Sequence, residues 1–122
     1  MTMDIIKKIV RSSILALRGL RHAYCSDKSF RAEIRYGLPI YLFLGWYLAP
    51  FYAWEFLFYV FSYLFILTVE LVNTAFEKML DRIHPEQHDL IGKSKDIASA
   101  AVFVSFVFAV IVVLALLASR NT

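Results

Sequence analysis

Three long stretches of this chain carry no charged side chain. They are Tyr36–Trp54, Phe56–Val69 and Ile97–Ser119, the last of them 23 residues long. Uncharged runs of about 20 residues are typical of helices that cross a lipid bilayer. Hydrophobic residues make up 60% of the 122 residues and the mean hydropathy is +0.62, too apolar for an ordinary soluble domain. We therefore expect an all-α integral membrane protein.

The breaks between these runs divide the chain into helices. Ala49-Pro50 ends the first run, because proline cannot continue a helix. The polar segment HPEQHDLIGK, residues 84–93, reads as a loop. The chain is expected to form a single membrane domain over residues 1–122. Its expected transmembrane helices cover about 33–49, 53–82 and 94–118.

The segment before the first expected span is basic and amphipathic. Residues 4–24 place Ile5, Ile9 and Leu17 at roughly helical spacing, with Lys and Arg on the other side. This pattern favours a helix lying on a membrane surface; a helix packed on another protein surface is the alternative. Ser26 or Asp27 is placed to cap the helix that follows.

Lysine and arginine counts set the expected orientation. Eight of them precede the first span, four lie within residues 78–96, and only Arg120 follows the third span. The positive-inside rule then puts the N-terminus and the 78–96 region in the cytoplasm. A basic segment beside a membrane span does not indicate nucleic-acid binding, because the basic residues are not interleaved with aromatic ones as in RNA- and DNA-binding modules.

One stripe of polar residues interrupts the apolar pattern. Glu70 follows the uncharged run directly, and Asn73, Glu77 and Asp81 continue at spacings of three, four and four residues. Residues at these spacings share one face of a helix. A carboxylate at the end of an apolar run costs at least a few kcal/mol to insert, which makes it a functional-site hypothesis by default.

Phosphoryl transfer is the chemistry that suits this stripe. Mg²⁺ binds through one or two carboxylates together with nucleotide phosphates, and Glu77 is well placed for it. Lys95 can neutralise phosphate charge. Glu70, in apolar surroundings, suits a general base acting on an alcohol.

Two other readings of the polar residues remain open at this point. The acids can be structural, paired to a polar group on a neighbouring helix. They can also line a non-enzymatic membrane oligomer that conducts protons or ions past Glu70 and Glu77. A pore would not need the Lys95-Asp96 pair or the basic N-terminal helix, so these features favour an enzyme over a pore. His84 and His88 flank a loop proline and are expected to be solvated rather than metal ligands.

The motifs around the stripe resemble a known family. ELVNTAFEKMLDRI at 70–83 and HDLIGKSKDIASAAV at 88–102 are similar to the signature of the small bacterial membrane diacylglycerol kinases, which are related to undecaprenol kinases. GLRHAY at 19–24 and SFRAE at 29–33 match the start of that family. The resemblance covers roughly residues 8–118.

The resemblance implies an activity and an assembly. It implies transfer of the ATP γ-phosphate to the hydroxyl of diacylglycerol, giving phosphatidate, with Mg²⁺ and with undecaprenol as the alternative acceptor. It also implies a homotrimer in the bacterial cytoplasmic membrane, with active sites at the subunit interfaces.

The resemblance further implies roles by position. Glu70 is the general base, and Asp27 and Glu77 hold the metal. Residues expected at the nucleotide are Lys8, Asp27, Glu77, Glu86, His88, Lys95 and Asp96. Residues expected on the substrate side are Glu70, Asn73, Ser99, Arg11 and Glu33.

Three positions depart from the family pattern. Asp27 is one methylene shorter than the usual Glu, and Lys8 stands where Arg is common, a point charge in place of a planar fork. Leu15 replaces a Tyr that lies by the nucleotide. We therefore expect activity with altered nucleotide affinity.

Overall fold

The computed structural model describes residues 1–86 and 88–121, and these residues form helices and no strand. Gln87, inside the expected loop, and Thr122 lie outside the described residues. The elements are α1 (Thr2–Ser26), α2 (Lys28–Ala32), the π-helix η1 (Glu33–Gly37), α3 (Leu38–Leu48), α4 (Ala53–Ile83) and α5 (Asp89–Arg120).

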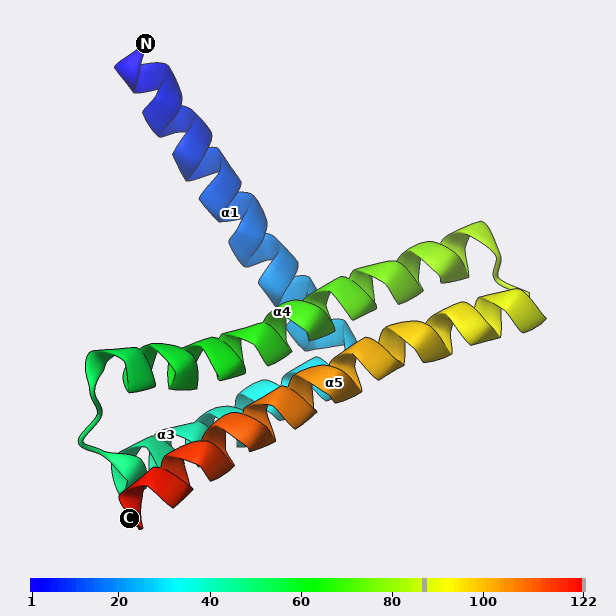
Figure 1. Cartoon of the computed structure of the whole chain (residues 1–122). Helices are drawn as coiled ribbons and strands as arrows, with labels where there is room; N and C mark the ends of the chain where they lie inside the picture. The colour runs from blue at the N-terminus through cyan, green and yellow to red at the C-terminus, as the bar shows by residue number, and fades with distance from the viewer. Residues whose placement is uncertain (87, 122) are drawn as a thin grey trace.

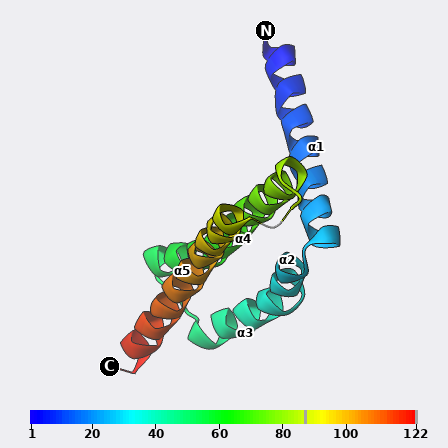
Figure 2. The same ribbon diagram turned by 90° about the vertical axis from the view of Figure 1, so that its right-hand side faces the viewer.

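The two longest helices form an antiparallel pair. Figure 1 shows α4 and α5 side by side, with α3 beside the end of the pair that carries the C-terminus. The C-terminal end of α1 lies near the middle of α4, and the rest of α1 projects away from the pair, as the rotated view also shows (Figure 2). The pair thus has one end at the α4–α5 connection and an opposite end at the turn between α3 and α4.

α4 and α5 are long and apolar enough to cross a membrane. At 1.5 Å per residue, the 31 residues of α4 span about 46 Å and the 32 of α5 about 48 Å. Both exceed the roughly 30 Å of bilayer hydrocarbon. Each helix is therefore longer than the apolar layer of a bilayer.

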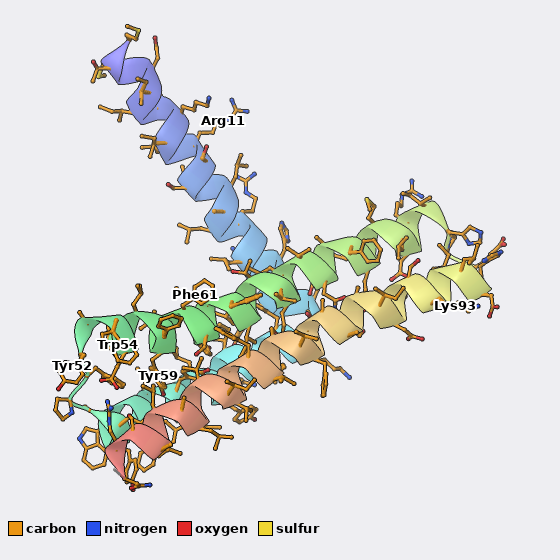
Figure 3. All side chains as sticks on the ribbon, in the orientation of Figure 1. Arg11, Tyr52, Trp54, Tyr59, Phe61 and Lys93 are labelled. Carbon is orange, nitrogen blue, oxygen red and sulfur yellow. The ribbon has the colours of Figure 1, made fainter. Side chains whose placement is uncertain are left out.

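Large apolar side chains point outward along these helices. Phe61 is 52% exposed, Leu57 68% and Phe103 68% (Phe61 is labelled in Figure 3). A soluble domain of this size would bury most such side chains. The exposed apolar surface agrees with the expected membrane class.

The first expected span differs from a plain helix. A continuous helical path runs from Lys28 to Leu48, but its second part is the π-helix η1. Pro39 has no N–H, and its ring crowds the carbonyl four residues earlier, so a regular α-turn does not pass through this point. The path ends at Leu48, and the following Ala49–Pro50 peptide bond is cis.

The helix that contains the third expected span, α5, begins before residue 94. The prediction of a loop reaching residue 93 was wrong, because α5 begins at Asp89. The ring Nδ1 of His88 accepts a hydrogen bond of 3.1 Å from the Leu90 N–H and caps the helix. Lys93 and Asp89, 3.7 Å apart, form an ion pair one turn apart in this first part of α5.

An ion pair closes the opposite end of the molecule. The Arg120 guanidinium donates to Glu55 Oε2 at 2.6 Å, to the carbonyl oxygen of Leu48 at 2.9 Å and to that of Pro50 at 3.0 Å. Glu55 is only 2% exposed. Arg120 thereby ties the end of α5 to the end of α3 and the start of α4.

The junction between α1 and α2 is fixed by two side chains. Asp27 accepts a hydrogen bond of 3.1 Å from the Ser29 N–H, which confirms that Asp27 caps the second helix. Arg31 donates to the carbonyl oxygens of Tyr24 and Cys25 at 2.9 and 2.8 Å, satisfying the end of α1. These bonds set the angle at which α1 leaves α2.

Candidate functional site

The acidic stripe lies along one face of α4 with a gradient of exposure. Glu70 is buried, at 4% exposed, and Glu77 is half-buried. The Asp81 side chain is 64% exposed, near the α4–α5 connection. The stripe therefore runs from an apolar environment toward water.

Asp27 reaches this stripe from the α1–α2 junction. Thr74 donates its hydroxyl to the Asp27 carboxylate and also lies 2.9 Å from the Glu70 carbonyl oxygen. Thr74 is one turn from Glu70 and one turn from Glu77, so Asp27 lies at a height between the two acids. The sequence pattern did not single out Thr74, which makes this contact.

The donor set near Asp27 fits a metal shared with a substrate. Among residues 1–86 and 88–121, no group of three or more His, Cys, Asp or Glu side chains is arranged to hold a metal. Asp27 contacts α4 at Thr74, and Glu77 lies about one turn along α4 from Thr74. Mg²⁺ is commonly held by one or two carboxylates, with phosphates and water completing its shell. The two acids fit that arrangement.

An apolar hollow of about 690 Å³ opens beside Glu70. Glu33 and Glu70 both line it. The remaining walls come from α2, η1, α3, α4 and α5 and are mostly apolar, among them Ile40, Leu44, Ile66, Phe106 and Val110. This apolar hollow suits a hydrocarbon chain whose polar end meets the two carboxylates.

Two buried polar oxygens on α4 are unpartnered among the described residues. They are Glu70 Oε2 and Asn73 Oδ1. Asn73 lines a separate hollow of about 240 Å³ between α4 and α5, with Ser94 and Ala98. Asn73 is therefore turned toward α5, whereas Glu70 faces the apolar hollow, and Glu70 Oε2 is available to a donor from outside the chain.

A polar hollow of about 720 Å³ lies at the α4–α5 connection. Lys95 and Asp81, both in its wall, form an ion pair of 2.5 Å. Four residues expected at the nucleotide come together in this polar hollow: Glu86, His88, Lys95 and Asp96.

His84 joins the same polar hollow, although the sequence predicted only a solvated ring. Its Nδ1 lies 3.1 Å from the Glu86 carbonyl oxygen, and its ring centre lies 5.5 Å from that of His88. His88 is exposed and His84 half-buried. The two rings form one wall of the polar hollow.

The residues expected from α1 lie elsewhere. Lys8 and Arg11 are exposed on the projecting part of α1, and Figure 3 shows Arg11 far from Lys93 at the α4–α5 connection. Ser99 is exposed on α5. The chain therefore gathers the carboxylates and the polar hollow but leaves these three residues apart.

Comparison with known proteins gives one consistent family. A sequence model described as prokaryotic diacylglycerol kinase matches residues 14–117. The chain is 33% identical over 100 residues to a protein of Haemophilus influenzae named diacylglycerol kinase, covering 80% of each chain. It is 32% identical over 104 residues to the protein of that name in Escherichia coli K12, covering 85% of this chain and 84% of the relative.

A more distant relative agrees. The protein named diacylglycerol kinase in Helicobacter pylori is 28% identical over 102 residues, covering 84% of this chain and 78% of the relative. The family match includes α2, η1, α3 and α4 in full and leaves out only the outer part of α1 and the last residues of α5.

Proposed function

The chain belongs to the prokaryotic diacylglycerol kinase family, and from that premise we propose that it phosphorylates diacylglycerol to phosphatidate with ATP. It is a lipid kinase. The observation that carries the proposal is the buried Glu70, which holds an unpartnered carboxylate oxygen at the edge of an apolar hollow of about 690 Å³.

Glu70 is proposed as the general base. The lipid lies with a hydrocarbon chain in the apolar hollow and its primary hydroxyl at Glu70. Glu70 accepts the hydroxyl proton as the oxygen forms a bond to the γ-phosphorus of ATP, and the bond from that phosphorus to the β,γ-bridging oxygen breaks to release ADP. Catalysis then depends mainly on position and electrostatic stabilisation.

Asp27 and Glu77 are proposed to hold Mg²⁺ with the ATP phosphates. The ion, when bound, balances the charge of the polyphosphate. Lys95, which forms an ion pair with Asp81 in the wall of the polar hollow, supplies a further positive charge. The polar hollow is large enough for the nucleotide, with Glu86, His88 and Asp96 in its walls. In this proposal ATP lies on the water side of Glu70 and the lipid on the bilayer side.

We further propose the finer arrangement in the membrane. The helical path Lys28–Leu48 forms a third span beside α4 and α5, with the N-terminus and the α4–α5 connection in the cytoplasm of a bacterial inner-membrane protein. A homotrimer is proposed because the lipid-facing helices expose much apolar surface and Lys8 and Arg11 lie apart from the polar hollow. A neighbouring chain would supply the missing contacts.

The decisive experiment is Glu70→Gln in purified, lipid-supplemented micelles. We expect the variant to fold and assemble as the parent does while phosphate transfer to diacylglycerol falls by a factor of about 100 or more. Glu55→Gln, at the far end of the same helix, is the matched control and should retain transfer. A Glu70→Gln enzyme with near-parental turnover would refute the base assignment.

The acceptor is tested in the same assay by comparing diacylglycerol with undecaprenol. Faster turnover with diacylglycerol is expected. Faster turnover with undecaprenol would mean that the protein is an undecaprenol kinase. The reading as a non-enzymatic conducting oligomer is wrong, because the chain belongs to a family of lipid kinases.

A further inference from the structure

The turn that carries Glu33 is not an ordinary helical turn. Glu33–Gly37 form the π-helix η1, in which the Leu38 N–H donates to the Glu33 carbonyl oxygen five residues earlier. Pro39, the second residue of the following helix α3, cannot donate to the carbonyl of residue 35. Single π-turns inside helices are frequent at functional sites. This turn lies in the wall of the apolar hollow.

Gly37 leaves the space that the Glu33 carboxylate occupies. A Cβ atom added at Gly37 would overlap a carboxylate oxygen of Glu33 and lie 2.8 Å from its Cδ. The atoms in the way belong to the far end of a flexible side chain and not to the backbone. A methyl group at position 37 would therefore move the carboxylate and leave the helix in place.

Tyr63 ties this turn to the face of α4 that carries Glu70. Its hydroxyl donates to the Glu33 carbonyl oxygen at 3.0 Å, and its ring centre lies 4.8 Å from that of Tyr41. Tyr63 is 7% exposed and precedes Glu70 by seven residues, two turns along the same face. One hydrogen bond thus links η1, which contains Glu33, to α4, which contains Glu70.

We infer that Gly37 and Tyr63 are positioning residues that hold the Glu33 carboxylate beside Glu70 at the polar edge of the apolar hollow. The inference rests on the proposed function, in which the lipid hydroxyl meets Glu70. The side chains of Glu33 and Glu70 both line the hollow. If the Glu33 carboxylate is displaced, the polar end of the lipid binds in a different position. The electrostatic field at Glu70, the proposed base, changes as well.

The first test is Gly37→Ala. Alanine favours a helix over glycine, so the fold is expected to hold. We expect kcat/KM for the lipid to fall on the order of 10- to 100-fold, as small misplacements at a reacting centre do, with KM for ATP unchanged. Gly19→Ala is the matched control, because a Cβ there meets nothing within 4 Å. Equal lipid kinetics in the two variants would overturn the inference.

The second test compares two tyrosines. Tyr63→Phe removes only the hydroxyl that bonds the Glu33 carbonyl, and the same lipid-specific loss is expected. Tyr59→Phe is its control, because the Tyr59 hydroxyl also donates across to the first helical path, at 2.5 Å from the Tyr41 carbonyl oxygen. A loss as large in Tyr59→Phe would mean that general helix packing is responsible, and the positioning role would fail.

A double variant separates positioning from structure. If Gly37 acts through Glu33, adding Gly37→Ala to Glu33→Gln should cause no further loss in kcat/KM for the lipid. A full additional loss would overturn the inference. A Glu70→Gln enzyme that stays active refutes the proposed function instead. An inactive Glu70→Gln beside a fully active Gly37→Ala refutes only the positioning role.

Discussion

Asp27 has a structural and a proposed metal-binding role, and substitution can separate the two. Its carboxylate caps α2 through the Ser29 N–H and accepts the Thr74 hydroxyl from α4. The proposed function also gives it a ligand position at Mg²⁺. Asp27→Ala removes all three interactions, whereas Asp27→Asn keeps an oxygen for the two hydrogen bonds and removes the charge.

The stability cost of each variant follows from these contacts. Loss of an N-cap costs about 1 kcal/mol, and a hydrogen bond to a charged group contributes about 1.5–3 kcal/mol. When the Asp27 carboxylate is absent, the Thr74 hydroxyl can donate to the Glu70 carbonyl oxygen, 2.9 Å away. This limits the free energy lost with the hydrogen bond between Thr74 and Asp27. We therefore expect Asp27→Ala to lower the free energy of unfolding by about 2 kcal/mol and Asp27→Asn by less than about 1 kcal/mol.

The activity of the two variants should not follow their stability. Both lack the carboxylate, so both should need on the order of 10- to 100-fold more Mg²⁺ for half-maximal turnover. Asp27→Glu should keep the metal dependence near that of the parent, with a weaker cap because glutamate is a poorer N-cap residue.

Two measurements decide the matter. Denaturant unfolding in micelles gives the change in free energy, and lipid-dependent ATP turnover titrated with Mg²⁺ gives the metal dependence. If Asp27→Asn shows the parental Mg²⁺ titration, the metal assignment is refuted. If Asp27→Ala is as stable as the parent, the capping argument is refuted.

Three further predictions concern the ends of the molecule and the metal. Lys95→Met should raise KM for ATP on the order of tenfold, whereas Asp81→Asn should change it much less, because Asp81 is exposed and carries no proposed contact to phosphate. Arg120→Gln leaves the Glu55 charge without its partner, and thermal scanning should show a lower unfolding midpoint with unchanged turnover at low temperature. Chelation with EDTA should abolish turnover, and added Mg²⁺ should restore it; turnover that survives EDTA would exclude a metal role.

The sequence was sufficient where structure follows from local pattern. The uncharged runs predicted α4 and α5, because a bilayer-length helix needs little more than apolar composition. The spacing of Glu70, Asn73, Glu77 and Asp81 predicted a shared face, because a helix repeats every 3.6 residues. Asn73 departs from that prediction, since it lines the small hollow toward α5 while Glu70 lines the apolar hollow. The Asp27 cap was likewise a local signal.

Local sequence patterns could not predict contacts between residues that are far apart in the sequence. Thr74 meets Asp27 across 47 positions, and Arg120 meets Glu55 across 65. No periodicity encodes which turn of one helix faces which turn of another. Pro39 was a visible signal for a disturbed helix, but its consequence, a π-turn that directs Glu33 into the apolar hollow, depends on the packing of Tyr63.

The position of α1 follows from a different cause. Its residues are exposed on all sides over Met1–Arg18, so the packing of this chain alone does not hold that part of the helix against α4 or α5. An amphipathic helix is placed by the bilayer surface and by neighbouring chains. Lys8 and Arg11 therefore differ in kind from Glu70 and Lys95, whose positions are set by packing within α4 and α5. We expect folding of the single chain to build the lipid side of the site and assembly to complete the nucleotide side.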